Sequence, residues 1–83
     1  MILQNVELTN IKVDNSSEKV VRFTADTTIG DIIAKLNCVT FDADVMEKVK
    51  KTKGNKTLTV GGYIKVNEYD GKYYINYIVT ELN

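Results

Sequence analysis

Apolar residues recur at alternate positions along most of the chain, which is the pattern of β-strands that bury one face. In the first segment, NVELTNIKV, the apolar positions are Val6, Leu8, Ile11 and Val13. Their alternation slips by one residue in the middle of the segment, which indicates a β-bulge near Thr9-Asn10. We therefore predict a first strand with one buried face and a bulge.

Turn-forming residues divide the next stretch into a loop and two strands. The run DNSSE, residues 14–18, concentrates side chains that hydrogen-bond their own backbone. KVVRFTADTT, residues 19–28, then returns to β-branched and aromatic residues. Gly30-Asp31 interrupts this pattern, and IIAKLNCVTF has strand composition up to Phe41. We predict that residues 20–41 form a hairpin of the second and third strands.

Helical periodicity occurs in DADVMEKVKKTK, where Val45, Met46 and Val49 share a face. Asp42 or Asp44 can cap the N-terminus of such a helix. Lysines gather toward its C-terminal end, where they suit the helix dipole: Lys48, Lys50, Lys51 and Lys53. Gly54-Asn55 is typical of a left-handed C-cap. We predict one short helix of about three turns at most.

The last part of the chain predicts a second hairpin. KTLTVGGYIKVN alternates apolar Leu58, Val60, Ile64 and Val66 against more polar positions, as a strand with one apolar face does. Gly61-Gly62 lies inside this strand, has no phosphate-loop context, and suits a bend or close packing at a barrel corner. Asp70-Gly71 is a strong hairpin signal, and KYYINYIVTEL supplies the fifth strand.

Three strands, a helix and a final hairpin follow the order of the OB-fold, a partly open Greek-key barrel. We therefore predict an all-β protein with one short helix: a five-stranded OB-fold barrel with the helix between strands three and four. A chain of 83 residues forms a single domain, residues 1–83, with a modest core.

Composition removes most catalytic chemistry. The chain has no histidine and one cysteine, which excludes the usual zinc sites and every histidine-based triad. We expect Cys38, in the apolar run LNCVTF, to be a small buried residue. The acidic pair Asp42 and Asp44 offers a metal site, but helix capping explains it without further assumptions. We predict no catalytic residue, no metal and no cofactor, and a protein that is not an enzyme.

Charge and hydropathy set further expectations. Eleven basic and eleven acidic residues cancel, so any electrostatic attraction to nucleic acid comes from local clustering. No apolar run approaches the roughly 18 residues of a membrane span, and the N-terminus lacks a signal-peptide pattern. We expect a cytoplasmic protein with no membrane partner.

From residue 36 onward, the motifs VTF, DVMEKVKK, TKGN, LTVGGYI, NEYDGKYY and INYIVTEL follow one another. In this order they resemble the bacterial and phage single-stranded DNA-binding protein family, whose domain has a Phe-ended strand, a helix, a lysine-glycine turn and a basic-aromatic hairpin. NVELTN and VVRFTADTT look like the family's first two strands. The chain lacks the acidic C-terminal tail of the cellular members, so it resembles a short phage- or mobile-element-type member, with tyrosine where tryptophan is frequent.

The resemblance implies a base-stacking role for Phe41 and for the hairpin residue Tyr69. Parity agrees for Phe41: if Leu36 and Cys38 point into the barrel, then Lys35, Asn37, Val39 and Phe41 point out. Rings alternating with lysines suit a strand of bases and its phosphates. The predicted nucleic-acid-binding residues are Phe41, Tyr69, Lys65, Lys35, Arg22, Tyr63, Lys72 and Tyr73.

Each assignment has a structural alternative. Phe41 can pack beneath the helix or in a dimer interface, and Tyr69 can pack across the turn on Tyr73. Of the strand-five tyrosines, Tyr73 and Tyr77 share a parity that Tyr74 does not, so parity alone leaves their faces open. The lysines of the helix and its exit, Lys48, Lys50, Lys51, Lys53 and Lys56, suit a solubilising face.

Two functional hypotheses follow. The first is a protein that binds single-stranded DNA, with RNA as an option, largely without sequence preference, by stacking and lysine-phosphate contacts in replication or recombination. The second is an OB-like protein-interaction module or a phage-encoded inhibitor that binds no nucleic acid. The family resemblance and the small size favour a homo-oligomer, a dimer or tetramer formed through exposed strand edges.

Overall fold

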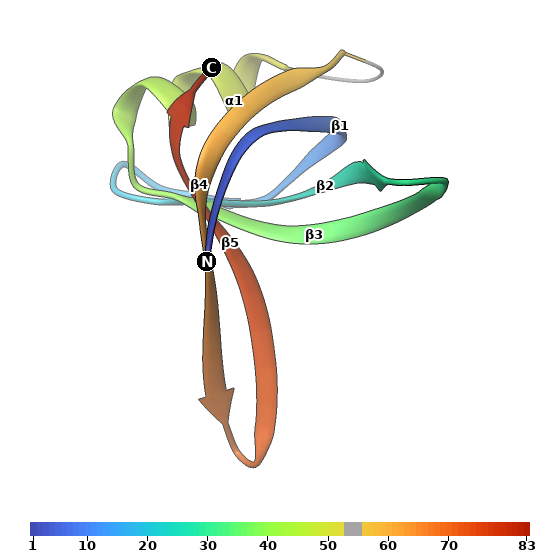
Figure 1. The fold of residues 1–83 in the computed structure, drawn as a ribbon. Helices are drawn as coiled ribbons and strands as arrows, with labels where there is room; N and C mark the ends of the chain where they lie inside the picture. The colour runs from blue at the N-terminus through green and yellow to red at the C-terminus, as the bar shows by residue number, and fades with distance from the viewer. Residues whose placement is uncertain (53–55) are drawn as a thin grey trace.

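The computed structural model describes residues 1–52 and 56–83, and its elements follow the predicted order (Figure 1). The strands are β1 (Ile2–Ser16), β2 (Val21–Ile29), β3 (Ile32–Thr40), β4 (Leu58–Tyr69) and β5 (Lys72–Leu82), and the helix α1 (Ala43–Lys51) lies between β3 and β4. The strands close into a barrel in the order β1-β2-β3-β5-β4, with β3 and β5 parallel. This topology confirms the prediction of an OB-fold barrel.

Strand β1 serves both sides of the barrel because bulges bend it. Its first half pairs with β4, and its second half, from Thr9 onward, pairs with β2. The predicted bulge is confirmed: the register shifts between Thr9 and Lys12, and Asn10 has φ 50°. A further shift between Leu3 and Val6 includes Asn5 at φ 55°. Asparagine tolerates this left-handed conformation better than most residues, so the bulges fall where the sequence allows them.

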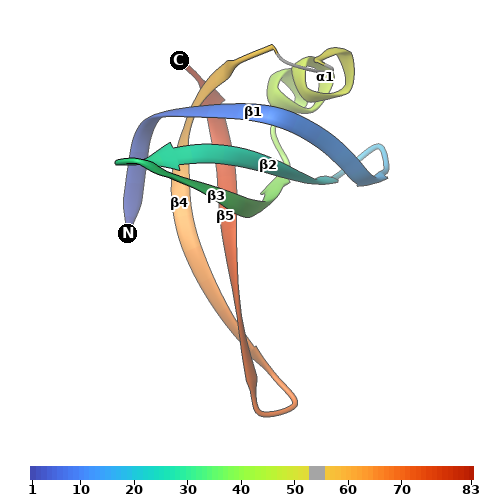
Figure 2. The ribbon, with the colours of Figure 1, turned by 90° about the vertical axis from the view of Figure 1, so that its right-hand side faces the viewer.

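The core lies inside the barrel and beneath the helix, which covers one end (Figure 2). The predicted helix face of Val45, Met46 and Val49 is confirmed, because all three residues are buried in the core. They pack there with side chains from all five strands: Leu8, Val21, Phe23, Cys38, Val60, Tyr77 and Val79. The predicted apolar face of β4 is confirmed, but its last residue is not buried. Ile64 packs against the core, whereas Val66 is 57% exposed because the strand has left the barrel there.

Beyond the barrel, β4 and β5 continue as a two-stranded hairpin, here called the arm (residues 65–76) (Figure 1). Tyr69 pairs with Lys72 across a two-residue turn. Both turn residues have positive φ, 52° at Asp70 and 77° at Gly71, which is the geometry that Asp-Gly hairpins adopt. The predicted hairpin is confirmed.

The start of α1 is fixed by two side chains. The Asp42 carboxylate accepts a hydrogen bond from the Val45 amide at 3.0 Å, which settles the predicted N-cap on Asp42. Two residues before Asp42, the buried Thr40 hydroxyl donates a hydrogen bond to the Val79 carbonyl at 2.8 Å and accepts one from the Asp42 amide at 3.2 Å. The end of β3, the helix start and β5 are therefore tied together.

The helix ends at Lys51. The amide of the next residue, Thr52, still donates to the Lys48 carbonyl, but its backbone is extended, with φ −89° and ψ 121°. The predicted C-cap at Gly54-Asn55 lies outside the described residues.

The glycine pair in β4 allows the close packing that the sequence indicates. Both glycines are buried. A Cβ at Gly62 would overlap the Ile78 carbonyl oxygen of β5, which belongs to the backbone and cannot move aside. A Cβ at Gly61 would instead meet the ends of the Gln4 and Glu81 side chains, which can rotate away.

This difference between neighbours predicts different costs. We expect Gly62→Ala to lower the free energy of unfolding by about 3 kcal/mol, since a backbone overlap forces strands β4 and β5 apart. Gly61→Ala is the matched control and should cost less than about 1 kcal/mol. Urea unfolding followed by circular dichroism measures both values, and equal losses in the two variants would contradict the packing described.

Candidate nucleic-acid interface

Cross-strand pairing decides which side chains of the arm share a face, because directly opposed residues project to the same side. The outward face of the arm, as we call it, contains four pairs: Tyr63 with Ile78, Lys65 with Asn76, Asn67 with Tyr74, and Tyr69 with Lys72. The pairing thus brings together four of the predicted binding residues, two tyrosines and two lysines. The Tyr69 ring, 74% exposed, is the most accessible of the tyrosine rings.

Tyr73 belongs to the other side of the arm. It pairs with Glu68, on the face that also carries Val66 and Ile75, and it is 72% exposed. The alternative in which Tyr69 packs across the turn on Tyr73 is therefore wrong, because the two rings project from opposite faces. Tyr73 lines a hollow of about 400 Å³ between β3 and the arm, which it shares with Lys35.

The other two tyrosines of β5, Tyr74 and Tyr77, also lie on opposite faces of the strand. Tyr77 is buried in the core, and its hydroxyl donates to the Leu3 carbonyl at 3.0 Å. Tyr74 lies on the outward face and is half-exposed, so it joins the candidate surface although the sequence analysis did not select it. The signal was present: a two-residue Asp70-Gly71 turn sets Tyr69 opposite Lys72, and Tyr74 then shares the parity of Lys72.

The outward face of the arm continues onto the barrel. Cys38 and Tyr77 pair in the core, so their neighbours Val39 and Ile78 project to the outer side. Arg22 pairs with Val39, and Tyr63 pairs with Ile78, which makes one row across four strands.

Sequence parity gave Val39 the correct direction but not its burial. Val39 is only 5% exposed and Ile78 only 7%, because their neighbours cover them on the outer side. Lys35 and Asn37 precede Val39 on the same face of β3 and are exposed, as predicted. Phe41 lies one residue beyond β3 and is 62% exposed, so it does not pack beneath the helix within this chain.

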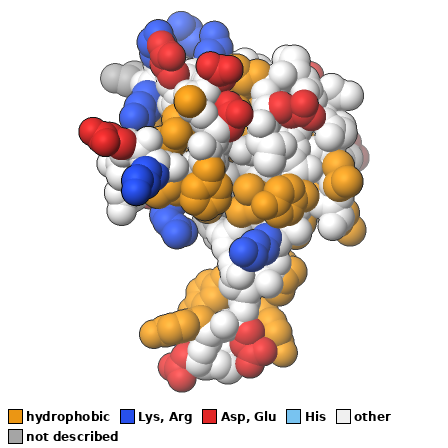
Figure 3. Space-filling model, turned by 90° about the vertical axis from the view of Figure 1, so that its left-hand side faces the viewer, with side chains coloured by type: hydrophobic (Ala, Val, Ile, Leu, Met, Phe, Trp, Pro, Cys, Tyr) orange, Lys and Arg blue, Asp and Glu red, His pale blue; other side chains and the backbone are white. Residues whose placement is uncertain are grey.

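The surface on one side of the molecule has the matching character. Figure 3 shows a band of hydrophobic side chains across the barrel just above the arm, with lysine or arginine side chains beside it. Acidic side chains gather at the far end of the arm. Apolar surface with adjacent cations is what stacked bases and their phosphates require.

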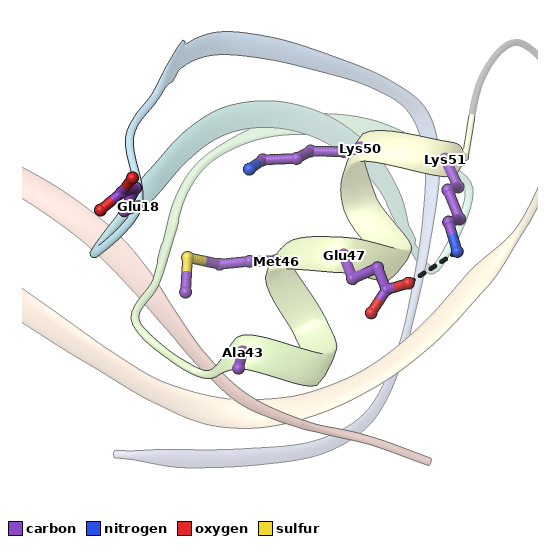
Figure 4. A pocket seen from close by; sticks show the side chains of 6 residues that line it. All are labelled: Glu18, Ala43, Met46, Glu47, Lys50 and Lys51. Atoms are coloured by element: carbon purple, nitrogen blue, oxygen red, sulfur yellow. Dashed lines mark hydrogen bonds and ion pairs between the residues drawn. The ribbon is translucent and has the colours of Figure 1, made fainter.

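The lysines of the helix lie elsewhere. A hollow of about 340 Å³ on α1 is lined by Met46, Glu47, Lys50 and Lys51, together with Glu18 and Ala43 (Figure 4). It contains no aromatic ring. The helix itself lies at the end of the molecule opposite the arm (Figure 1). Lys51 and Glu47 form an ion pair at 2.7 Å there, and this pairing lowers the pKa of the Glu47 carboxyl.

The cysteine of the chain, Cys38, lies in the core. Cys38 is 2% exposed, as expected, and burial raises the pKa of its thiol to about 12, so it stays protonated. The Asp42 carboxylate is occupied as the helix cap. Within residues 1–52 and 56–83, no three histidine, cysteine or acidic side chains gather as a metal site would need.

Comparison with known proteins identifies the fold. Neither the protein-family models nor the curated proteins include a match to this sequence. Among solved structures, the chain is similar to the SSB domain of a protein from Synechococcus sp., with a TM-score of 0.60 and 15% identity over 99% of this chain and 90% of that one. The closed five-stranded barrel with a short helix between β3 and β4 is thus an OB-fold, and it matches the fold of that SSB domain. None of the described helical residues forms a segment long and apolar enough to cross a membrane.

The buried thiol and phenol make stability depend on alkaline pH. The pKa of Cys38 is raised from 9.0 to about 12 and that of Tyr77 from 10.0 to about 12, in both cases chiefly by burial. As the pH rises, both groups therefore lose their protons at a lower pH in the unfolded chain than in the folded one. Their contribution to stability is complete below about pH 9 and is lost as the pH rises toward 12.

We expect the free energy of unfolding to fall between about pH 9 and about pH 12, and to fall less in Tyr77→Phe than in the wild type. Urea unfolding at a series of pH values measures this fall. Tyr73→Phe, which changes an exposed phenol, is the control and should match the wild type. The same pH dependence in wild type and Tyr77→Phe would contradict the role of the buried hydroxyl.

Proposed function

We propose that this protein is a non-catalytic OB-fold module that binds single-stranded nucleic acid, DNA in particular, largely without sequence preference. The observation that carries the proposal is the outward face of the arm, where exposed tyrosines alternate with lysines and no carboxylate intervenes. The likeness of the fold to an SSB domain supports the same conclusion.

Charge is sorted between the two faces of the arm. Lys65 and Lys72 lie on the outward face, whereas Glu68 lies on the opposite face with Tyr73. The chain as a whole is neutral, yet this surface is positive. Such sorting serves phosphate contacts without a net charge on the protein.

In this proposal, bases stack on Phe41 and Tyr69, with Tyr63 between them along the surface. The rings of Phe41 and Tyr69 are more than 60% exposed, and a stacked base would cover their apolar faces. From Tyr63 to Tyr69 the strand extends for about 20 Å, a length suited to several nucleotides. The phosphates are bound by Lys65, Lys72, Lys35 and Arg22. Tyr73 takes no part in the stacking because it lies on the face of the arm opposite Tyr69.

The protein acts, in our proposal, in the cytoplasm as a dimer or tetramer of a phage- or mobile-element-type replication or recombination system. A second candidate function, a protein-interaction module, is favoured by a different surface. Val66 and Ile75 are opposed on the inner face of the arm and are 57% and 59% exposed. Contiguous exposed apolar side chains of this kind mark protein contacts as well as ligand sites.

The stacking mechanism predicts the effect of removing both rings. We expect a Phe41→Ala/Tyr69→Ala double variant to bind a fluorescent oligo-dT at least about 30-fold more weakly than the wild type, because each stacked base contributes about 1–3 kcal/mol. Fluorescence anisotropy measures the affinity, and circular dichroism checks the fold.

Tyr73→Ala is the matched control, since this ring is as exposed as Tyr69 but lies on the opposite face of the same arm. Its affinity for oligo-dT should equal that of the wild type. An equal loss in both variants would contradict the assignment to the outward face. No binding of oligo-dT by the wild type at low salt would contradict nucleic-acid binding and favour a protein partner.

The phosphate contacts predict a limited salt dependence. Four cations on the surface give a slope of log K against log salt no steeper than about −3 for a single strand. Lys65→Gln/Lys72→Gln should roughly halve this slope. The control pair Lys48→Gln/Lys50→Gln, on the helix, should leave it unchanged. A slope governed by the helix lysines would overturn the location of the phosphate path.

A further inference from the structure

A small pocket opens on the barrel beside the candidate surface. It has a volume of about 200 Å³, and its walls include Asp14 from β1, Arg22 from β2, Asn37 and Val39 from β3, and Asn76 from β5. Four polar residues from four strands therefore converge around an apolar part of the wall, which Val39 shares with Phe23 and Cys38. This composition, a few placed polar groups around apolar surface, is typical of a small-ligand site.

A bulge in β1 puts Asp14 at the pocket. Val13 pairs with Phe23 and Asn15 pairs with Arg22, so Asp14 is the extra residue between two consecutive pairs. A bulge of this kind re-aims a side chain that the regular ladder would direct elsewhere. The carboxylate thus stands at the pocket together with the Arg22 side chain of the neighbouring strand.

The polar groups of the pocket are available to a ligand. Within residues 1–52 and 56–83, no side-chain hydrogen bond or ion pair joins Asp14, Arg22, Asn37 or Asn76 to another group of the protein. Arg22 and Asp14 line one pocket without forming a salt bridge of 4.0 Å or less. The pocket therefore presents an acceptor pair and several donors side by side.

A carboxylate beside a phosphate-binding surface repels the backbone of a nucleic acid, unless it accepts hydrogen bonds from a base. Of the bases, guanine presents two adjacent donors, N1–H and the 2-amino group, next to the O6 acceptor on its Watson–Crick edge. Adenine, cytosine and thymine each place an acceptor where guanine has one of these donors. The two oxygens of Asp14 match the donors, and the side-chain amide of Asn37 or Asn76 donates to O6, which leaves Arg22 for a phosphate.

We propose that the pocket of Asp14, Arg22, Asn37, Val39 and Asn76 is a subsite for one guanine base, which adds a single base-reading position to an otherwise unselective surface. The inference rests on the proposed binding of single-stranded nucleic acid. Asn37, Val39 and Phe41 are alternate residues of the chain, about 7 Å apart, so the pocket lies next to the proposed stacking position at Phe41. One nucleotide stacks on Phe41 while its neighbour enters the pocket.

The test compares fluorescent oligonucleotides of one length: oligo-dT, and the same strand with one central dG, dA or dC. We expect the dG strand to bind about tenfold more tightly than the other three. Inosine, which lacks the 2-amino group, should lose most of this gain. The analogue 7-deazaguanine keeps the Watson–Crick edge and should retain it.

Asp14→Asn removes one acceptor and should abolish the preference for dG while oligo-dT binds at least as well as before. The matched control is Asp31→Asn, which makes the same change at the β2–β3 turn and should keep the preference. Oligo-dT binding without a dG preference, or a preference that survives Asp14→Asn, would overturn the subsite alone. Failure of the wild type to bind any of the strands would overturn the proposed function and the subsite with it.

Discussion

The structure depends on the short parallel pairing of β3 with β5, three residue pairs from Cys38–Thr40 to Tyr77–Val79. This pairing closes the barrel, and its last member, Thr40, is fully buried. The Thr40 hydroxyl links the β5 backbone to the residue that caps the helix. A buried polar group that is fully hydrogen-bonded in this way fixes one arrangement of its neighbours, because any other would leave it unsatisfied. The same side chain thus stabilises both the closure of the barrel and the start of the helix.

The brevity of that pairing creates the candidate surface. Beyond Cys38 and Tyr77, strand β3 no longer accompanies β5, so β4 and β5 leave the barrel as the arm. A two-stranded hairpin has two faces and little core of its own. The arm uses them differently: one carries tyrosines and lysines, the other Val66, Ile75 and Glu68. The first face is continuous with the outer side of the barrel, so the barrel and arm form one surface.

Local rules predicted the elements of the fold. The Asp-Gly turn, the Asp42 cap, the slip of alternation near Asn10 and the glycine pair in β4 each have a physical cause within a few residues of sequence, and the structure confirms each. The order of three strands, a helix and a final hairpin indicated the OB-fold topology, and the resemblance to single-stranded DNA-binding proteins agreed with it. The order of elements and the barrel were therefore accessible before the structure was known.

Cross-strand register could not be predicted as fully. Alternation placed Val66 correctly on the apolar face of β4, but it cannot tell where the strand leaves the barrel and that face becomes exposed. Outward direction was correct for Val39, but its burial depends on neighbours from β2 and β5 that meet it only in three dimensions. The two-residue turn already implies that Tyr69 and Tyr73 lie on opposite faces of the arm. The placement of Asp14 could not be predicted, because it follows from a bulge that no glycine or break in alternation indicates.

The chain ends differ in their relation to the arm. The Met1 carbonyl accepts a hydrogen bond from the Ile64 amide, and Ile2 pairs with Tyr63, so the first residues lie at the root of the arm beside the outward face. The last strand instead ends at the end of the molecule opposite the arm (Figure 2), where Leu82 lines a hollow together with residues of the helix. An affinity tag or a surface linker at the C-terminus would hold the molecule by its helical end and leave the arm facing solution. The same attachment at the N-terminus would crowd Tyr63, so the choice of terminus decides whether an immobilised sample reports on this surface at all.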